Sequence, residues 1–470
     1  MTRVEHRVVA AVCIVVGISL VIGASLTFLL TPMLNDLGLT SDDGSTALTL
    51  PSIGSLMVVF IAGRLGDRIG HRRVIVGASA FFILGSALVA GAQGMPGVTL
   101  GLLLAGAAAT AIQIVALGLL QVSIPSGPSR VSAFTTFGMV FPTVYLLVPV
   151  VTGWAVGVAS WRWVPLTWAI LGLLMPIAVL RLIERPEARL SAGEMWTPVL
   201  GGLVLAGFVQ ALNSGSDNGW LAPRTLAVVA VTMAAIALSA ILLRRVAAPS
   251  LSLAPLRDRA LVLLLACVIL IVTVNTLIYA TLALEYLYSE SVLAAAIYLV
   301  PAQLAAIIGA KTLAAVLMRR WGTARAGTLV IIGLALSLFT LVLMRPDSPI
   351  GQLVASAALF SLFGFASITI ANAAVMAEAR PGEAGAVSAY RGAASAVGSA
   401  LSIVFLGGII GLVVRTAYLE PAGDIPDPAA LAKGLQTHGV VGIVIALAAA
   451  GLFAWGMRQR VRDTSSSSPG

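Results

Sequence analysis

The chain has 470 residues, of which 59% are hydrophobic and 10% are charged, and its formal net charge is +9. Its mean hydropathy of +1.03 means more apolar surface than soluble cores can bury, which excludes a soluble globular protein. The positive charge does not indicate a nucleic-acid-binding protein, because the basic residues lie singly or in short clusters between apolar runs rather than in a domain.

Apolar runs follow one another along the whole chain, and each is long enough to cross a bilayer, which takes about 20 residues in a helix. They lack the alternation of barrel strands, so they predict an all-α polytopic membrane protein. The first run follows two arginines as in a signal peptide, but its length and the later runs favour a retained helix. We expect fourteen spans, near residues 8–31, 45–63, 74–93, 98–120, 131–157, 164–182, 196–213, 224–243, 260–284, 291–317, 326–344, 351–376, 385–414 and 437–457.

The distribution of arginine and lysine between the spans predicts the topology. If both termini are cytoplasmic, the inner segments hold 22 of the 28 basic residues, the outer loops hold five and one lies in a span. Cytoplasmic loops of membrane proteins are enriched in this way. We therefore expect a multi-pass protein of the cell membrane with both termini in the cytoplasm.

Few residues suggest a metal site, a cofactor or an enzyme. Cys13 and Cys267 lie in apolar runs without ligand spacing, and the three histidines are scattered. No phosphate-binding loop, zinc-protease motif or nucleophile elbow occurs in the sequence. We expect no enzymatic activity and no cofactor.

A charged stretch, GRLGDRIGHRR at 63–73, interrupts the apolar runs between the second and third spans. Gly63 permits close helix approach, Asp67 can pair with a basic group or a helix N-terminus, and the arginines hold the loop inside. The spacing closely resembles the signature that the major facilitator superfamily carries between these spans. The resemblance implies a conformational latch formed by Gly63, Asp67, Arg68, Gly70, Arg72 and Arg73.

A partial repeat of this loop, VLMRRWGTAR at 316–325, places Gly322 in a position like that of Gly70. Internal repeats of this kind are common in transporters.

Further stretches resemble the fourteen-span drug:proton antiporters of that superfamily: SWRW at 160–163, NGW at 218–220, SVLAAAIYLVP at 291–301 and EAGAVSA at 383–389. The resemblance implies two six-helix bundles, at 1–190 and 251–462, joined by two extra linker helices at 191–250. The remaining tail, 463–470, is predicted to be disordered.

The chain also departs from the pattern of these antiporters. Gly23 and Phe28 replace the aspartate and asparagine of the first span, and Gly106 replaces the buried arginine of the fourth. In the fifth span the glycine-rich motif is reduced to Pro149 and Gly153. These departures put proton coupling by the usual route in doubt.

Ionisable and polar side chains inside spans are candidates for coupling or substrate binding. Glu285 either reaches water at the outer end of the ninth span or faces a cavity, and Lys311 either reaches the interface or attracts an anion. Arg391 is expected to anchor the inner end of the thirteenth span. Among uncharged residues, Gln113, Tyr145, Asn275 and Asn372 are candidates, with interhelical hydrogen bonds as the alternative.

Because polar residues are sparse in the spans, we expect a largely apolar cavity, which suits an amphipathic cargo better than a sugar. The sequence favours a monomeric exporter of amphipathic small molecules, surrounded by membrane lipid and driven by protons. A carrier of a lipid or an anionic metabolite is the alternative within transport. A non-transporting receptor or scaffold is the alternative of another class, although it has no evident need of a latch.

Overall fold

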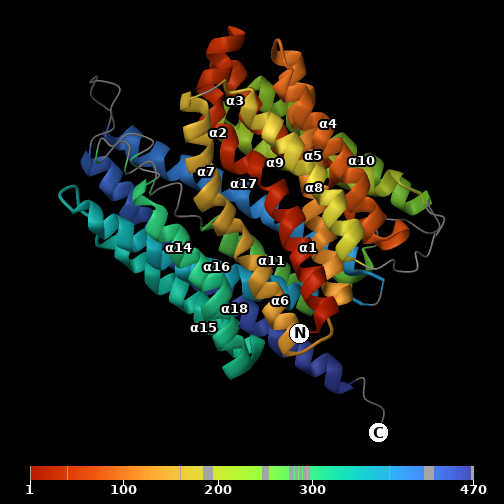
Figure 1. Ribbon diagram of the computed structural model, residues 1–470. Coiled ribbons are helices and arrows are strands. Elements are labelled where there is room, and N and C mark those ends of the chain that lie inside the picture. The colour runs from red at the N-terminus through yellow and green to blue at the C-terminus, as the bar shows by residue number, and fades with distance from the viewer. Residues whose placement is uncertain are drawn as a thin grey trace. The chain divides into compact units, whose positions relative to one another are not determined.

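The computed structural model describes residues 2–39, 41–158, 160–183, 194–245, 253–274, 280, 284, 288, 294, 297–380, 382–417 and 428–466. Every regular element in these ranges is a helix, as the sequence predicts. The helices divide into two compact units (Figure 1), each of which is described by itself. Unit 1 comprises residues 1–210, 227–253 and 379–393, and unit 2 comprises 211–226, 254–378 and 394–470.

Unit 1 is built mainly from the first ten helices. Its centre is α5, against which α1, α3 and α4 pack, while α8 covers α1 and α4. The helices are α1 (Arg3–Ser19), α2 (Val21–Leu37), α3 (Ser41–Ile69), α4 (His71–Ala90), α5 (Met95–Ser123), α6 (Pro128–Gly138), α7 (Val140–Val158), α8 (Trp163–Leu182), α9 (Trp196–Asn218) and α10 (Pro223–Arg245).

Unit 2 contains most of the remaining helices. In it α15 packs on α16 and α18, α11 packs on α18, and α14 packs on α16. The elements are the 3₁₀ turn η1 (Ala254–Arg257), α11 (Arg259–Thr273), α14 (Val300–Ile308), the π-helical segment η2 (Gly309–Leu313), α15 (Ala314–Val342), α16 (Ile350–Met376), α17 (Ala384–Ala417) and α18 (Pro428–Ser466). The first turns of α17, up to residue 393, belong to unit 1.

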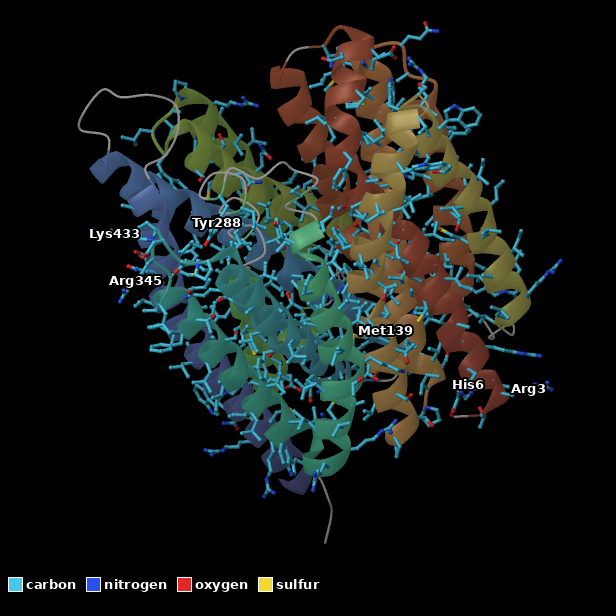
Figure 2. All side chains as sticks on the ribbon, turned by 60° about the vertical axis from the view of Figure 1, so that its left-hand side comes forward. Arg3, His6, Met139, Tyr288, Arg345 and Lys433 are labelled. Carbon is cyan, nitrogen blue, oxygen red and sulfur yellow. The ribbon has the colours of Figure 1, made fainter. Side chains whose placement is uncertain are left out.

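Local sequence explains where several helices begin and end. Thr2 and Glu5 form a capping box at the start of α1, and Gly38 ends α2 with a φ of 63°. The Asp258 side chain accepts hydrogen bonds from the first amides of α11. Figure 2 shows Arg3 and His6 at the beginning of α1.

At one end of unit 2, loop contacts join three segments. The Tyr288 hydroxyl donates to the carbonyl of Ser348 over 2.7 Å, and Gln436 of α18 donates to the carbonyl of Met344 over 2.6 Å. Figure 2 shows Tyr288, Arg345 and Lys433 at this end.

Eleven helical stretches among the described residues are long and apolar enough to cross a membrane. One of them, Val300–Val342, is two helices, because Gly322 has a φ of 73° inside α15. The outward faces suit lipid, since large apolar side chains such as Trp154 on α7 and Val231 on α10 are exposed. The count of fourteen spans, and the division of the chain at residues 190 and 250, stay predictions.

Several expected boundaries differ from the structure. Two helices, α1 and α2, meet at Leu20 in the first span, the backbone of Leu20 stays in the α region, and α2 continues to Leu37. The tenth span contains the π-helical segment Gly309–Leu313. Residues 463–466, placed in the predicted tail, are the last turn of α18.

Candidate functional site

The charged stretch at the end of α3 contacts the beginning of α17 within unit 1. One oxygen of Asp67, Oδ1, accepts a hydrogen bond from the Gly385 amide over 2.8 Å, and Oδ2 accepts one from the Ala386 amide over 3.0 Å. Amides in the first turn of a helix have no partner within the helix, and they attract negative charge. Of the two partners that the sequence allows for Asp67, the structure therefore shows the helix N-terminus.

Two glycines allow this contact, because α3 and α17 approach backbone to backbone. A Cβ atom added at Gly63 would meet the carbonyl oxygen of Gly385 and lie 2.8 Å from the Cβ of Ala389. A Cβ added at Gly385 would lie 2.8 Å from Oδ1 of Asp67. Glycine at both positions thus permits the Asp67 hydrogen bonds.

Two basic residues of this stretch, Arg68 and Arg72, contact neighbouring segments of unit 1. An amino group of Arg68, Nη1, contacts the sulfur of Met195 at 3.4 Å, while Arg72 donates from Nη2 to the carbonyl of Leu180 over 3.0 Å, at the end of α8. The Arg73 side chain is exposed.

Glycines with positive φ support the predicted internal repeat. Gly70, between α3 and α4, has a φ of 93°, and Gly322 has a φ of 73°. Gly127, before α6, and Gly382, before α17, have φ values of 118° and 87°. A positive φ favours glycine, so the two halves use the same residue type at corresponding turns.

Two of the positions that depart from the drug:proton antiporters, Gly23 and Gly106, have different surroundings. At Gly23 of α2, a Cβ atom would lie 2.9 Å from the hydroxyl of Tyr145, which reaches across from α7. At Gly106 of α5, a Cβ would lie 2.5 Å from the Cα of Pro51 in α3. Ser55 reinforces this approach by donating to the Gly106 carbonyl over 3.1 Å.

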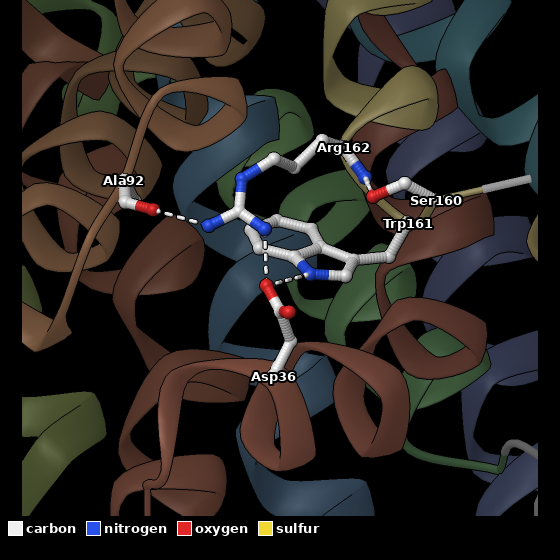
Figure 3. A network of polar contacts seen from close by, with 5 residues as sticks. All are labelled: Asp36, Ala92, Ser160, Trp161 and Arg162. Carbon is white, nitrogen blue, oxygen red and sulfur yellow. Dashed lines mark hydrogen bonds and ion pairs between the residues drawn. The ribbon is translucent and has the colours of Figure 1, made fainter.

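An ion-pair network joins three helices of unit 1 (Figure 3). Asp36, in the last turn of α2, pairs with Arg162 and accepts a hydrogen bond from Nε1 of Trp161 over 3.0 Å. Arg162 also donates to the Ala92 carbonyl after α4 over 2.9 Å, and its guanidinium carbon lies 4.6 Å from the Trp161 ring centroid. Hydrogen bonds from Trp161 and Arg162 lower the pKa of the Asp36 carboxyl.

The sequence reasoning missed the role of Asp36 in this network. The signal for this network in the sequence is the stretch SWRW at 160–163, which contains Trp161 and Arg162.

The remaining candidates do not converge on one described site. Gln113 is partly buried in α5, and Lys311 lies in the π-helical segment of unit 2, a distortion that is frequent at functional sites. Asn372 is buried in α16, and its Oδ1 has no hydrogen-bond partner among the described residues. Glu285 and Asn275 lie outside the described residues.

Arg391 is partly buried on α17, whose first turns lie against α3 and α5. Its Nε is inaccessible to solvent and has no hydrogen-bond partner among the described residues. Its expected role as an anchor at the membrane surface stays a prediction.

Comparison with known proteins identifies the family and the fold. Residues 11–403 match the sequence profile of the Major Facilitator Superfamily. A structure of the human organic anion transporter MFSD10 superposes with a TM-score of 0.63 and 14% identity, over 95% of this chain and 100% of that one.

Curated relatives are transport proteins of bacteria. A Mycobacterium tuberculosis protein described as an uncharacterized MFS-type transporter is 34% identical over 128 residues, which are 27% of this chain and 18% of that protein. The tetracenomycin C resistance and export protein of Streptomyces glaucescens is 26% identical over 74% of this chain and 65% of its own length. This chain thus matches less than two thirds of the length of either relative.

Proposed function

The chain belongs to the major facilitator superfamily, and from this premise we propose that it exports hydrophobic or amphipathic small molecules by alternating access, in exchange for protons. The family and the MFSD10 fold indicate a membrane transporter rather than an enzyme. The more specific proposal is a fourteen-span drug:proton antiporter of the cell membrane, with both termini in the cytoplasm. The export function named for the S. glaucescens relative supports the direction.

The contact between Asp67 and the first amides of α17 is the observation that carries the proposal. It depends on two hydrogen bonds and on close backbone contact at Gly63 and Gly385. Such a contact can open and close without loss of an apolar core, which suits a protein that alternates between conformations. A receptor or scaffold would not need this reversible contact.

The apolar character of the spans supports the proposed class of cargo. Polar side chains are sparse in them, and a sugar site needs many hydrogen-bonding groups. A second candidate, a carrier of a lipid or an anionic metabolite, is favoured by Gly23 and Gly106, which remove an acid and a base from the usual polar apparatus.

Transport by purified protein in lipid vesicles tests the proposal. A pH gradient is imposed across the vesicles, and the uptake of a cationic, a neutral and an anionic amphiphile of similar size is measured together with internal pH. Substrate-dependent proton movement supports the antiporter. Anion uptake without proton movement favours the second candidate, and no uptake of any amphiphile in vesicles that contain folded protein contradicts both.

A further inference from the structure

Arg391 lies where α17 packs against two other helices of unit 1. Three residues earlier, the Ser388 hydroxyl donates to the carbonyl of Ile114 in α5 over 2.8 Å. A Cβ atom at the next residue, Gly392, would lie 3.6 Å from the side chain of Ile114 and 3.8 Å from that of Val59 in α3. The backbone at Arg391 is therefore enclosed on one side by apolar residues.

Arg391 has no ion-pair partner among the described residues, and in its buried, unpaired Nε it resembles Arg64 and Arg72. In contrast, Arg162 pairs with Asp36, Arg460 pairs with Glu378, and Arg130 donates twice to the carbonyl of Ile124. A guanidinium cannot lose its proton in a protein, so Arg391 keeps a charge at this enclosed position.

An unpaired charge that is taken out of water destabilises a fold unless an anion or dipoles compensate it. Arg391 as a whole retains part of its accessible surface, so a ligand can approach the side chain. A planar guanidinium binds carboxylate, sulfonate and phosphate groups through paired hydrogen bonds. Val59 and Ile114, which lie against the adjacent Gly392, place apolar side chains of α3 and α5 beside this turn of α17.

We propose that Arg391 binds the anionic head group of an amphipathic ligand whose apolar part lies against α3 and α5. The proposal deepens the proposed function, because it names an anionic amphiphile as the substrate class. An anionic lipid head group has the same chemistry, and the experiment below separates the two sources.

The first experiment measures binding without transport. The protein is placed in nanodiscs of phosphatidylcholine, and fluorescence titration gives the affinity for anilinonaphthalene sulfonate, an amphipathic anion, and for rhodamine 6G, an amphipathic cation. We expect Arg391→Gln to weaken binding of the anion by about tenfold or more, the scale of a lost hydrogen bond to a charged group, and to leave the cation nearly unchanged. Arg391→Lys keeps the charge but not the planar guanidinium, so its affinity for the anion should lie between those of the wild type and Arg391→Gln.

Arg130→Gln is the matched control, because it removes a positive charge from the same unit at a side chain that is bonded to Ile124. It should leave both affinities unchanged. Equal anion affinity in wild type and Arg391→Gln would overturn the proposal, and so would equal loss for both probes, which indicates a structural role. If Arg391→Gln does not fold, the anion and cation affinities of Arg391→Lys are compared with those of the wild type, and the same outcomes support or overturn the proposal.

The second experiment adds phosphatidylglycerol to the nanodiscs. If a lipid head group occupies Arg391, anion binding falls in the wild type but not in Arg391→Gln; if the site serves the substrate, the added lipid changes neither. Binding needs no gradient, so the result is separate from the transport assay. Arg391-dependent binding without transport contradicts the exporter alone, while transport with Arg391-independent binding contradicts the anion site alone.

Discussion

Replacing Asp67 by asparagine should release the first turn of α17 from α3. The carboxylate uses one oxygen for the Gly385 amide and the other for the Ala386 amide. Asparagine has one oxygen, and its NH₂ group would face the second amide as a donor against a donor. The variant also loses the negative charge at a helix N-terminus.

The magnitude follows from these two losses. A hydrogen bond to a charged group contributes about 1.5–3 kcal/mol, and charge at a helix terminus contributes about 0.3–1 kcal/mol. Because the asparagine oxygen keeps one bond, we take about 2 kcal/mol as the net effect, which is about thirtyfold in the equilibrium between capped and uncapped states.

Hydrogen exchange measures this equilibrium directly. Amide exchange in peptides that cover residues 384–388 should become about thirtyfold faster in Asp67→Asn, while expression is retained and transport in vesicles slows. Arg73→Gln is the control, because that side chain is exposed and should leave exchange unchanged. Unchanged exchange in Asp67→Asn would refute the reasoning, and unchanged transport would show that the cap does not control the transport cycle.

Four further predictions concern packing and the network of Figure 3. Gly63→Ala should lower the unfolding free energy by about 1–3 kcal/mol through overpacking against α17, as seen in the thermal midpoint. Gly106→Ala should do the same against α3, whereas Gly77→Ala, which meets no atom within 4 Å, should not lower the midpoint. Arg162→Gln should lower the midpoint at pH 7, and an equal midpoint would show that the network contributes nothing. Because the pKa of Asp36 is lowered in the folded protein, the network stabilises the fold at every pH above the ordinary aspartate pKa of about 3.9. This stabilisation is lost only as the pH falls through the lower pKa of the folded state. A loss of stability from this network between pH 7 and pH 5 would contradict the prediction.

The helical architecture could be predicted because apolar runs of sufficient length leave the backbone few alternatives in lipid. Irregularities within the helices could not be predicted in this way. The junction of α1 and α2 at Leu20 lies inside a continuous apolar run, and the π-helical segment Gly309–Leu313 differs from its surroundings only by Lys311, which does not indicate a change of helix type. The sequence did indicate the irregularity at Gly322, because this glycine lies in a charged stretch that resembles the one around Gly70.

Site contacts were predictable only where a local motif restricted them. The carboxylate of Asp67 was expected to pair with a basic group or a helix N-terminus, but the amides it meets lie more than 300 residues away in sequence. The surroundings of Arg391 could not be predicted for a related reason. A lone arginine at the end of an apolar run looks the same in the sequence whether it reaches water or is enclosed by helices from elsewhere in the chain.

Gly23 and Gly106 differ in what they allow, and this difference bears on coupling. At Gly23 only the end of a flexible tyrosine side chain occupies the place of a larger residue, so this position remains adaptable. At Gly106 the obstacle is the backbone of α3 at Pro51, so an arginine there would require the helices to separate. The close α3–α5 contact and the acid–arginine pair of the drug:proton antiporters therefore exclude each other in this arrangement. A carboxylate that couples transport to protons must then act without that arginine, which makes Glu285, outside the described residues, the side chain to test first.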